Sequence, residues 1–165
     1  MVKEKKTRTL DVREQIKDPT SFPWRIKSDS VPWRIKSDSV DEINCVGVLE
    51  YIPGAARGKF MDEVYRVLVT GGKATFIVAY WNNVKAIQDY RYQWPPLSEQ
   101  SFLFFNKGWR EANKLELGIV CDFDFTYGYG CDPETAARNE ESRSFHVKHY
   151  TNCVDALHLM LTKRP

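Results

Sequence analysis

The sequence has no glycine before Gly47. A glycine-rich turn, which lets the backbone approach a phosphate or a cofactor, is therefore excluded from this stretch. The sequence also has no apolar run near the roughly 20 residues of a membrane helix. The basic start MVKEKKTRT is not followed by an apolar segment, so no secretory signal is predicted. We expect a cytoplasmic protein without a membrane span.

Strong charge of one sign is also missing, because the formal net charge is only +2. This value does not argue for a nucleic-acid partner. The few cysteines do not predict a disulfide framework in a chain of 165 residues, and we expect reduced thiols. Zinc is an alternative, but the candidate ligands lack a C-x-x-C pair and no metal site is predicted. These candidates are Cys121, Cys131, His146, His149 and Cys153; the fourth cysteine is Cys45.

A nine-residue segment occurs twice in tandem. Residues 23–31 and residues 32–40 both read PWRIKSDSV. Solenoid repeats are longer and recur several times, so one doubling does not predict a repeat architecture. Deleting either copy leaves the continuous sequence SFPWRIKSDSVDEINCV. We interpret the extra copy as an insertion from a recent duplication or from engineering. Each copy is predicted to be a loop with a short extended piece, WRIK.

The segment after the repeat predicts a strand, a helix and a second strand. Residues 41–48 (DEINCVGV) are rich in β-branched residues, and residues 73–81 (KATFIVAYW) are strongly apolar. Between them, residues 58–68 place their apolar side chains on one helical face. Gly71 and Gly72 are expected to end this helix. Such a unit is typical of a right-handed crossover between parallel strands.

The second half predicts further elements of one domain, residues 1–165. Residues 82–97, with two adjacent prolines, predict a long loop or lid. Ser98 can cap a helix that runs to about Leu115. Residues 119–129 predict a strand, and residues 143–149 and 154–162 predict further extended segments. The expected fold class is α/β: a mostly parallel sheet of about five strands with antiparallel C-terminal strands.

Two blocks of sequence resemble class I S-adenosylmethionine-dependent methyltransferases. The first is DSVDEINCVGVLEYIP and the second is FMDEVYRVLVTGGKATFIV. Residues 49–51 (Leu-Glu-Tyr) match a triplet that follows the family's fourth strand. Residues 66–72 match the pattern before its fifth strand, except that Val69 and Thr70 replace lysine and proline. The resemblance covers roughly residues 10–125.

The resemblance implies a partial Rossmann-like methyltransferase fold with S-adenosylmethionine as cofactor. In open α/β sheets the site lies beyond the carboxyl ends of the strands. The cofactor-binding residues implied by this position are Cys45, Val48, Leu49, Glu50 and Tyr51. The implied substrate-binding residues are Tyr80, Trp81, Asp89 and Trp94. Two readings stay open here: Asp89 is a general base or part of a solvated loop, and Glu50 contacts the ligands or only favours the helix dipole.

The family's glycine-rich motif, E/D-x-G-x-G-x-G, has no counterpart in this sequence. We therefore expect an N-terminally truncated member, in which Leu10-Asp11-Val12 is a remnant of the third strand. In the family order 3-2-1-4-5-7-6, loss of strands 1 and 2 leaves residues 43–48 as an open edge. We expect this edge to pair with the N-terminal segment, including a WRIK copy, or with a second molecule in a homodimer.

Two functions from different classes follow. The first is methyl transfer from S-adenosylmethionine to an unidentified acceptor, a small molecule or a macromolecule, with impaired cofactor binding. The second is a non-catalytic methyltransferase-fold remnant that acts as a binding or assembly module. A third reading is a chain, of engineered or evolutionary origin, that absorbs a duplicated segment.

Overall fold

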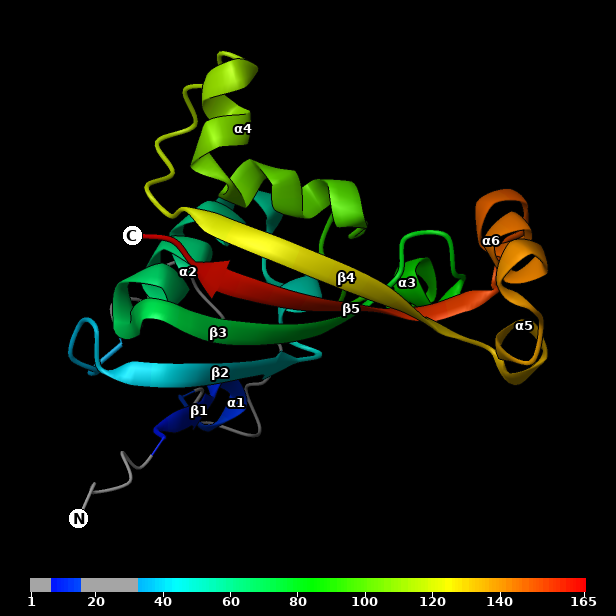
Figure 1. Ribbon diagram of the computed structural model, residues 1–165, viewed down its shortest axis with the longest axis horizontal. Coiled ribbons are helices and arrows are strands. Elements are labelled where there is room, and N and C mark those ends of the chain that lie inside the picture. Colours follow the sequence, from blue (N-terminus) through cyan, green and yellow to red (C-terminus); the bar gives the residue numbers. More distant parts are fainter. Residues whose placement is uncertain (1–6, 16–32) are drawn as a thin grey trace.

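The computed structural model describes residues 7–15 and 33–165. They form a five-stranded sheet with the order β1-β2-β3-β5-β4 (Figure 1). The first three strands are parallel, and β5 is antiparallel to both β3 and β4. The expected α/β fold with antiparallel C-terminal strands is therefore confirmed. The strands are β1 (Thr9–Asp11), β2 (Val40–Val46), β3 (Leu68–Ala79), β4 (Phe123–Cys131) and β5 (Val154–Lys163).

Helices connect the strands and gather mostly on one face of the sheet and beyond its ends (Figure 1). In the described part of the chain, no helix is both long enough and apolar enough to cross a membrane. The helices are α1 (Val12–Gln15), the 3-10 helix η2 (Leu49–Tyr51), α2 (Gly54–Val67), α3 (Lys85–Gln88), the 3-10 helix η3 (Glu99–Phe105), α4 (Lys107–Ala112), α5 (Pro133–Ala136) and α6 (Glu140–His149).

The predicted strand–helix–strand unit is confirmed as β2, α2 and β3. The two strands run parallel, with Ile43 opposite Ala74 and Cys45 opposite Phe76. Phe60 and Val64 of α2 are buried against the sheet, as the apolar face of residues 58–68 predicts. This unit places the ends of β2 and β3 side by side at one edge of the sheet.

The open edge of β2 is covered by β1. Leu10 lies opposite Ile43 in a parallel ladder, so the expected pairing with the N-terminal segment is confirmed. The assignment of Leu10 to Val12 as a third strand is wrong, because β1 lies directly beside β2, where the family order has strand 1. The second WRIK copy forms no strand in its described residues, 33–36; the first copy lies outside the described residues.

The two glycines do not end the helix, contrary to the prediction. Helix α2 ends at Val67, and Leu68 already has extended backbone. Gly71 has φ +76° inside an irregular part of β3. A Cβ on Gly72 would lie 2.8 Å from the carbonyl oxygen of Val69, closer than real Cβ contacts allow, and 3.0 Å from the carbonyl oxygen of Asp41 on β2. Both glycines therefore allow the backbone conformation and the close approach that the pairing of β2 with β3 requires.

Two further predictions about the second half need correction. The expected helix from Ser98 to Leu115 is split into η3 and α4 by Asn106, whose Oδ1 accepts from Trp109 N at 2.8 Å. Residues 143–149 are not extended but lie in α6. Asn139 caps this helix by accepting from Ser142 N at 2.9 Å, and a cap of this type satisfies a free backbone donor.

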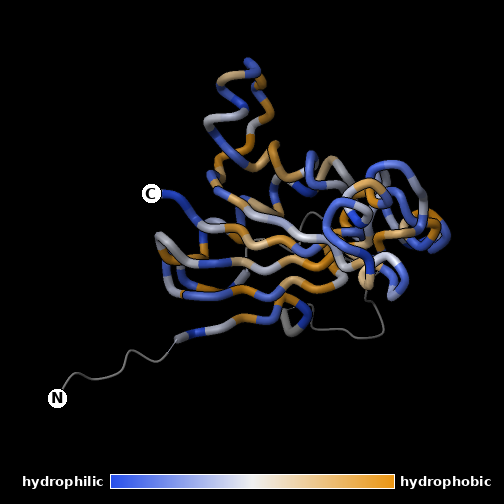
Figure 2. The backbone as a smooth tube through the Cα atoms, turned by 45° about the vertical axis from the view of Figure 1, so that its right-hand side comes forward, coloured by the Kyte–Doolittle hydropathy of each residue, from blue (hydrophilic) through white to orange (hydrophobic). Residues whose placement is uncertain are grey.

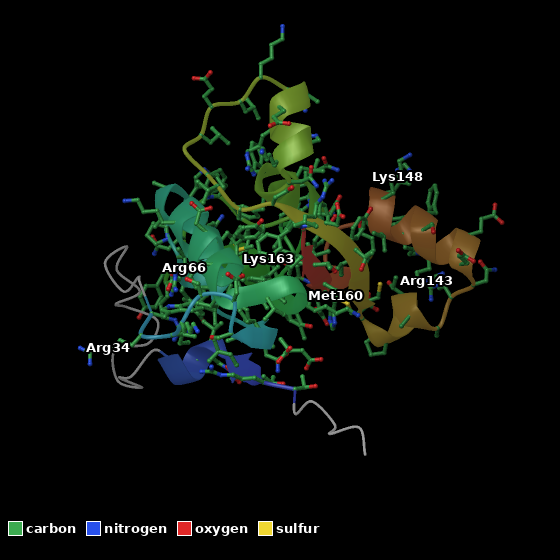
Figure 3. The ribbon with its side chains drawn as sticks, turned by 60° about the vertical axis from the view of Figure 1, so that its left-hand side comes forward. Arg34, Arg66, Arg143, Lys148, Met160 and Lys163 are labelled. Carbon is green, nitrogen blue, oxygen red and sulfur yellow. The ribbon has the colours of Figure 1, made fainter. Side chains whose placement is uncertain are left out.

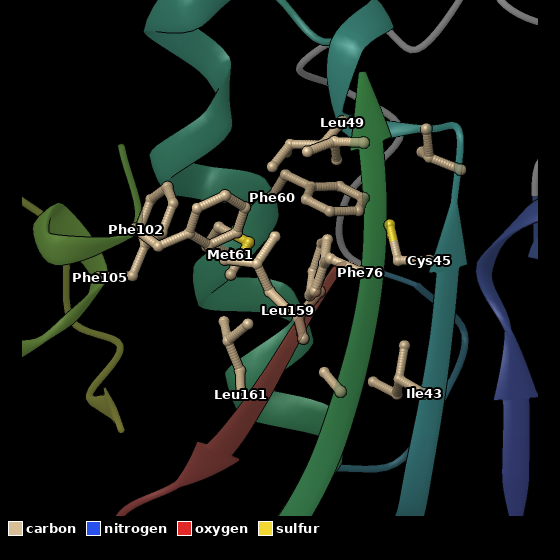
Figure 4. Packing of buried hydrophobic residues seen from close by; sticks show 14 of the residues in the cluster. Ile43, Cys45, Leu49, Phe60, Met61, Phe76, Phe102, Phe105, Leu159 and Leu161 are labelled. Carbon is tan, nitrogen blue, oxygen red and sulfur yellow. The ribbon is translucent and has the colours of Figure 1, made fainter. Parts of the chain in front are cut away.

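The hydrophobic core lies between the sheet and the helices on one face. Figure 4 shows Phe60 and Met61 of α2 and Phe102 of η3 packed over Phe76 and Leu159. Hydrophobic positions recur along the strands in Figure 2, because alternate side chains point to this face. Side chains of the opposite face, including Lys73, His158 and Met160, are exposed.

The second repeat copy docks on α2. Trp33 N donates to Glu63 Oε1 at 2.6 Å, and its ring meets Phe60 edge to face. Arg66 pairs with Glu63 at 2.7 Å and also donates to the carbonyl oxygen of Ile35 at 2.9 Å. This part of the repeat is therefore a packed loop that leads into β2 (Figure 3).

Candidate functional site

The site begins where β2 ends. Gly47 has φ +61°, and a Cβ there would meet nothing within 4 Å. The chain then turns into η2, which places Glu50 inside the protein with only 6% of its surface exposed. Glu50 Oε1 accepts from Ala79 N at 2.9 Å, and its carbonyl oxygen accepts from Gln93 N at 2.7 Å. Glu50 thus joins the ends of β2 and β3 and the loop after β3.

Arg57 of α2 holds the same loop from the other side. Its guanidinium donates to the carbonyl oxygens of Ile52 at 3.0 Å, Gln93 at 2.9 Å and Pro95 at 2.6 Å. Burial lowers the pKa of Arg57 to about 10, and the nearby charge of Glu50 opposes this shift. The side chain remains a cation and joins the carbonyl group of Ile52, just before α2, to two carbonyl groups of the loop after β3.

Burial raises the pKa of Glu50, although the hydrogen bond from Ala79 favours its charged form. Glu50 Oε2 is buried and has no hydrogen-bond partner within residues 7–15 and 33–165. A cavity of about 10 Å³ lies beside Glu50 and Arg57. This volume suits one water molecule and not a larger ligand.

The structure brings the predicted cofactor-binding residues together but buries most of them. Cys45, Val48 and Leu49 are fully buried, and burial raises the pKa of the Cys45 thiol. Only Tyr51 is partly exposed. Its ring meets Tyr92 edge to face at 4.9 Å. A ligand at this edge would therefore touch backbone and the ring of Tyr51.

Two of the predicted substrate-binding residues lie on the loop after β3. Asp89 forms an ion pair with Arg91, and this hydrogen bond holds the pKa of Asp89 below its ordinary value. The guanidinium of Arg91 in turn lies over the ring of Tyr51. Trp94 is 79% exposed. Neither Asp89 nor Trp94 lines the large cavity described next.

The other two, Tyr80 and Trp81, lie at the end of β3 and line a cavity of about 870 Å³. The end of β3, the start of η3, the end of β4 and α6 border this cavity, which is open to solvent on one side. We call it the β3–α6 pocket. It is lined by Tyr80, Trp81, Asn82, Ser98, Glu99, Gln100, Tyr129, Cys131, Ala136, Arg143, Ser144, Val147 and Lys148.

The sheet side of the β3–α6 pocket carries aromatic rings and one acid. Tyr80 and Tyr129 meet edge to face at 5.4 Å. Burial raises the pKa of both hydroxyls, and the nearby carboxylate of Glu99 adds to both shifts. Glu99 Oε2 is buried and has no hydrogen-bond partner among the residues that the structure describes. This wall therefore presents neutral phenols around an acceptor oxygen.

The opposite wall is α6, which contributes Arg143 and Lys148 (Figure 3). Neither cation has an acidic partner within ion-pair distance among the described residues. Sequence reasoning did not find Glu99, Tyr129, Arg143 or Lys148 as pocket residues. The only sequence signal was Glu99 itself, as the acid in the first turn after Ser98. The other three residues lie on β4 and α6, which are distant from Tyr80 and Trp81 in the sequence.

The residues at the ends of β1 and β2 can be compared with the chemical groups of S-adenosylmethionine. Asp11 ends β1, and its carboxylate pairs with Arg13 at 3.0 Å. Adjacent opposite charges are complementary to the amino-acid end of that cofactor, which carries an ammonium and a carboxylate. The open backbone at Gly47 lies at the end of the adjacent strand. These residues fit the group, although Arg13 stands two residues after the acid, where the family motif has its first glycine.

The described residues do not form the zinc site that the cysteines and histidines offered as an alternative. Across residues 7–15 and 33–165, no group of three His, Cys, Asp or Glu side chains is placed to hold a metal ion. Cys121 is buried and Cys131 and Cys153 are partly buried, all as free thiols.

No protein-family model and no curated protein sequence matches this chain. Among solved structures, it is similar to an S-adenosylmethionine-dependent methyltransferase from Archaeoglobus fulgidus. The TM-score is 0.51 at 10% identity, over 78% of this chain and 62% of that one. This chain therefore spans about three fifths of the length of that protein, and the likeness shows the fold.

Two further solved structures are similar to this chain at lower TM-scores. One is a methyltransferase from Thermotoga maritima, described as a possible histamine N-methyltransferase, with TM-score 0.48 and 11% identity over 81% of this chain and 60% of that one. The other is a phosphoethanolamine N-methyltransferase from Haemonchus contortus, solved with phosphomonomethylethanolamine and S-adenosylhomocysteine. Its TM-score is 0.45 at 13% identity, over 84% of this chain and 36% of that one.

Proposed function

We propose that this chain, which has the fold of the class I S-adenosylmethionine-dependent methyltransferases, is a methyltransferase-like protein with a small-molecule acceptor. The observation that carries the proposal is the parallel unit β2-α2-β3 with the β3–α6 pocket beyond the end of β3. Ligands of open α/β sheets bind beyond the carboxyl ends of the strands. A volume of about 870 Å³ lies within the usual range for small-molecule sites.

The ends of β1 and β2 are the proposed cofactor side. S-adenosylmethionine supplies a methyl group on a positively charged sulfur. Asp11 would accept from its ammonium group and Arg13 would donate to its carboxylate. Gly47 would let the ligand approach the backbone, and the ring of Tyr51 would cover one side. Impaired binding is part of this proposal, since the pair of charges must open to take the ligand.

The end of β3 is the proposed acceptor side. Tyr80 and Trp81 leave β3 beside the end of β2, so an acceptor held by them lies near the proposed cofactor site. Holding two reactants in fixed positions removes much of the entropic cost of their meeting. Tyr80 and Tyr129 remain neutral because burial raises their pKa values, so we assign them positioning and exclusion of water.

A non-catalytic binding module is the second candidate. The observation that favours it is Arg13, a charged side chain where the family motif has a glycine. Under this reading the β3–α6 pocket still binds its ligand, but no methyl group is transferred. Loss of catalysis would then follow from the cofactor side alone.

Calorimetric titration with S-adenosylmethionine and S-adenosylhomocysteine tests the proposal. A dissociation constant at or below about 100 μM, which corresponds to roughly 5.5 kcal/mol, supports cofactor binding. We expect Asp11→Asn to weaken it by about tenfold, because a charge-assisted contact is lost. Asp132→Asn, a matched change at the cap of α5, should leave it unchanged. Absence of heat at millimolar ligand contradicts the methyltransferase proposal and leaves the binding module.

A further inference from the structure

We propose that the β3–α6 pocket recognises a small molecule that carries a cationic amine at one end and an anionic group at the other. The proposal rests on the proposed function in one respect, since it names the chemical class of the acceptor. The recognition itself depends only on the residues that line the pocket, and it can be measured without any cofactor.

The amine end is assigned to the wall formed by β3, η3 and β4. Glu99 Oε2 is buried without a hydrogen-bond partner in the described part of the chain, and leaving a buried acceptor unpaired is costly. The rings of Tyr80 and Tyr129 lie next to this carboxylate, and Trp81 extends the aromatic surface. A carboxylate bordered by aromatic rings suits an ammonium group, which gains both an ionic hydrogen bond and cation–π contact.

The anionic end is assigned to α6. Arg143 and Lys148 both line the pocket and have no acidic partner among the described residues. Glu99 does not supply one, since no ion pair joins it to either cation in the described chain. The acid and the cations therefore remain available on opposite walls of the same cavity. A single ligand with both charges satisfies all three groups at once.

An amino carboxylate and an amino phosphate share this chemistry, and binding experiments can separate them. The probes for calorimetry are ε-aminocaproate, hexylamine, caproate and aminohexyl phosphate. We expect ε-aminocaproate to bind about tenfold more tightly than hexylamine or caproate, because each end adds a charged contact. Tighter binding of aminohexyl phosphate assigns the anionic end to a phosphate, and tighter binding of ε-aminocaproate assigns it to a carboxylate. Backbone NMR shifts at Tyr129 and Val147 report whether the probe lies in the pocket.

Variants separate the two walls. Glu99→Gln should lower the affinity for ε-aminocaproate and hexylamine about tenfold and leave caproate within about twofold. The double variant Arg143→Gln/Lys148→Gln should weaken ε-aminocaproate and caproate and leave hexylamine unchanged. Glu141→Gln makes the same charge change as Glu99→Gln, and Lys59→Gln/Lys114→Gln makes the same charge change as the double variant. All three residues lie outside the pocket, so these controls should alter none of the affinities. Thermal unfolding of each variant checks that it is folded.

The proposal is overturned if the three simple probes bind equally well, or if neither Glu99→Gln nor the double variant changes their affinities. Either result would mean that a water molecule, and not the amine of a ligand, is the hydrogen-bond partner of Glu99. Failure of the proposed function is a separate outcome. The pocket chemistry stands if ε-aminocaproate binds while S-adenosylmethionine does not, and it fails if only the cofactor binds.

Discussion

Glu50 Oε1 accepts a hydrogen bond from the backbone amide of Ala79 at 2.9 Å. This contact joins the turn after β2 to the last residue of β3, where the two strands diverge toward their loops. The triplet 49–51 therefore has a structural role in this chain. Its acid turns into the protein, and Tyr51 is the one residue of the triplet that is partly exposed.

The burial of Glu50 makes the stability of the protein depend on pH. Burial raises the pKa of Glu50 above its ordinary value of 4.5, so the folded state holds this proton more tightly than the unfolded chain. The protonated Glu50 side chain therefore contributes stability that is fully present below the pKa of the group in the unfolded chain. This stability is lost as pH rises through the pKa of the group in the folded protein. Glu50→Gln removes it. We expect the free energy of unfolding of the wild type, relative to the variant, to fall from about pH 4 to about pH 8.

Urea unfolding of both proteins across this range measures the difference. Glu141→Gln, an exposed change on α6, should give a nearly constant difference. A constant difference for Glu50→Gln as well would contradict the assignment.

Removal of the Arg57 side chain should be strongly destabilising. Three carbonyl groups lose their donor, and Glu50 loses the nearby positive charge. We expect Arg57→Ala to lower the free energy of unfolding by about 3–5 kcal/mol, as for other broken buried charge networks. Lys59→Ala, an exposed lysine on the same helix, should cost less than about 0.5 kcal/mol. A small effect of Arg57→Ala in chemical denaturation would show that the loop after β3 does not depend on it.

Docking of the second repeat copy on α2 can be tested at Trp33. Its ring packs on Phe60 at 5.8 Å between centroids, and it is partly buried. Trp33→Ala should reduce the free energy of unfolding by about 2 kcal/mol, roughly half the value for a fully buried tryptophan. Arg34→Ala changes the exposed neighbour and should have little effect. Equal effects of the two changes in thermal unfolding would refute the docked arrangement.

Thiol reactivity should divide the cysteines into two groups. Burial raises the pKa of the thiols of Cys45 and Cys121, and thiolates are the reactive species. We expect both to react with Ellman's reagent only after unfolding. Cys131 and Cys153, which are partly exposed, should react in the native protein, with Cys131 the slower because burial also raises its pKa. Fast reaction of all four thiols would disprove the buried positions.

We propose that the chain forms a homodimer through an exposed strand edge. Within residues 7–15 and 33–165, β1 pairs on one side only, with β2, and β4 pairs only with β5. Unpaired strand edges favour association. Light scattering after size-exclusion chromatography should give about twice the mass of 19.2 kDa. A monomer at high micromolar concentration, with rapid amide exchange in β1 and β4, would be evidence against this state.

The parallel unit was predictable because its signals are local. The apolar runs of β2 and β3 and the one-sided face of α2 act through neighbouring residues, so the crossover followed from their order. α6 was missed because it buries no residue, and a helix without an apolar face leaves no hydrophobic periodicity. Its signals were the cap at Asn139 and the acids at Glu140 and Glu141. The break between η3 and α4 at Asn106 also depends on a residue distant in the sequence, because the Asn106 side chain donates to Phe123 O at 2.9 Å.

By itself, the sequence determined the methyltransferase-like core and the position of Tyr80 and Trp81 at the end of a strand. The tertiary structure decided that Glu50 faces inward, that β1 pairs with β2, and that Glu99 shares a cavity with Arg143. Periodicity reports which side of an element is apolar. The partners of a buried charge depend on which distant segments the packed core brings beside it.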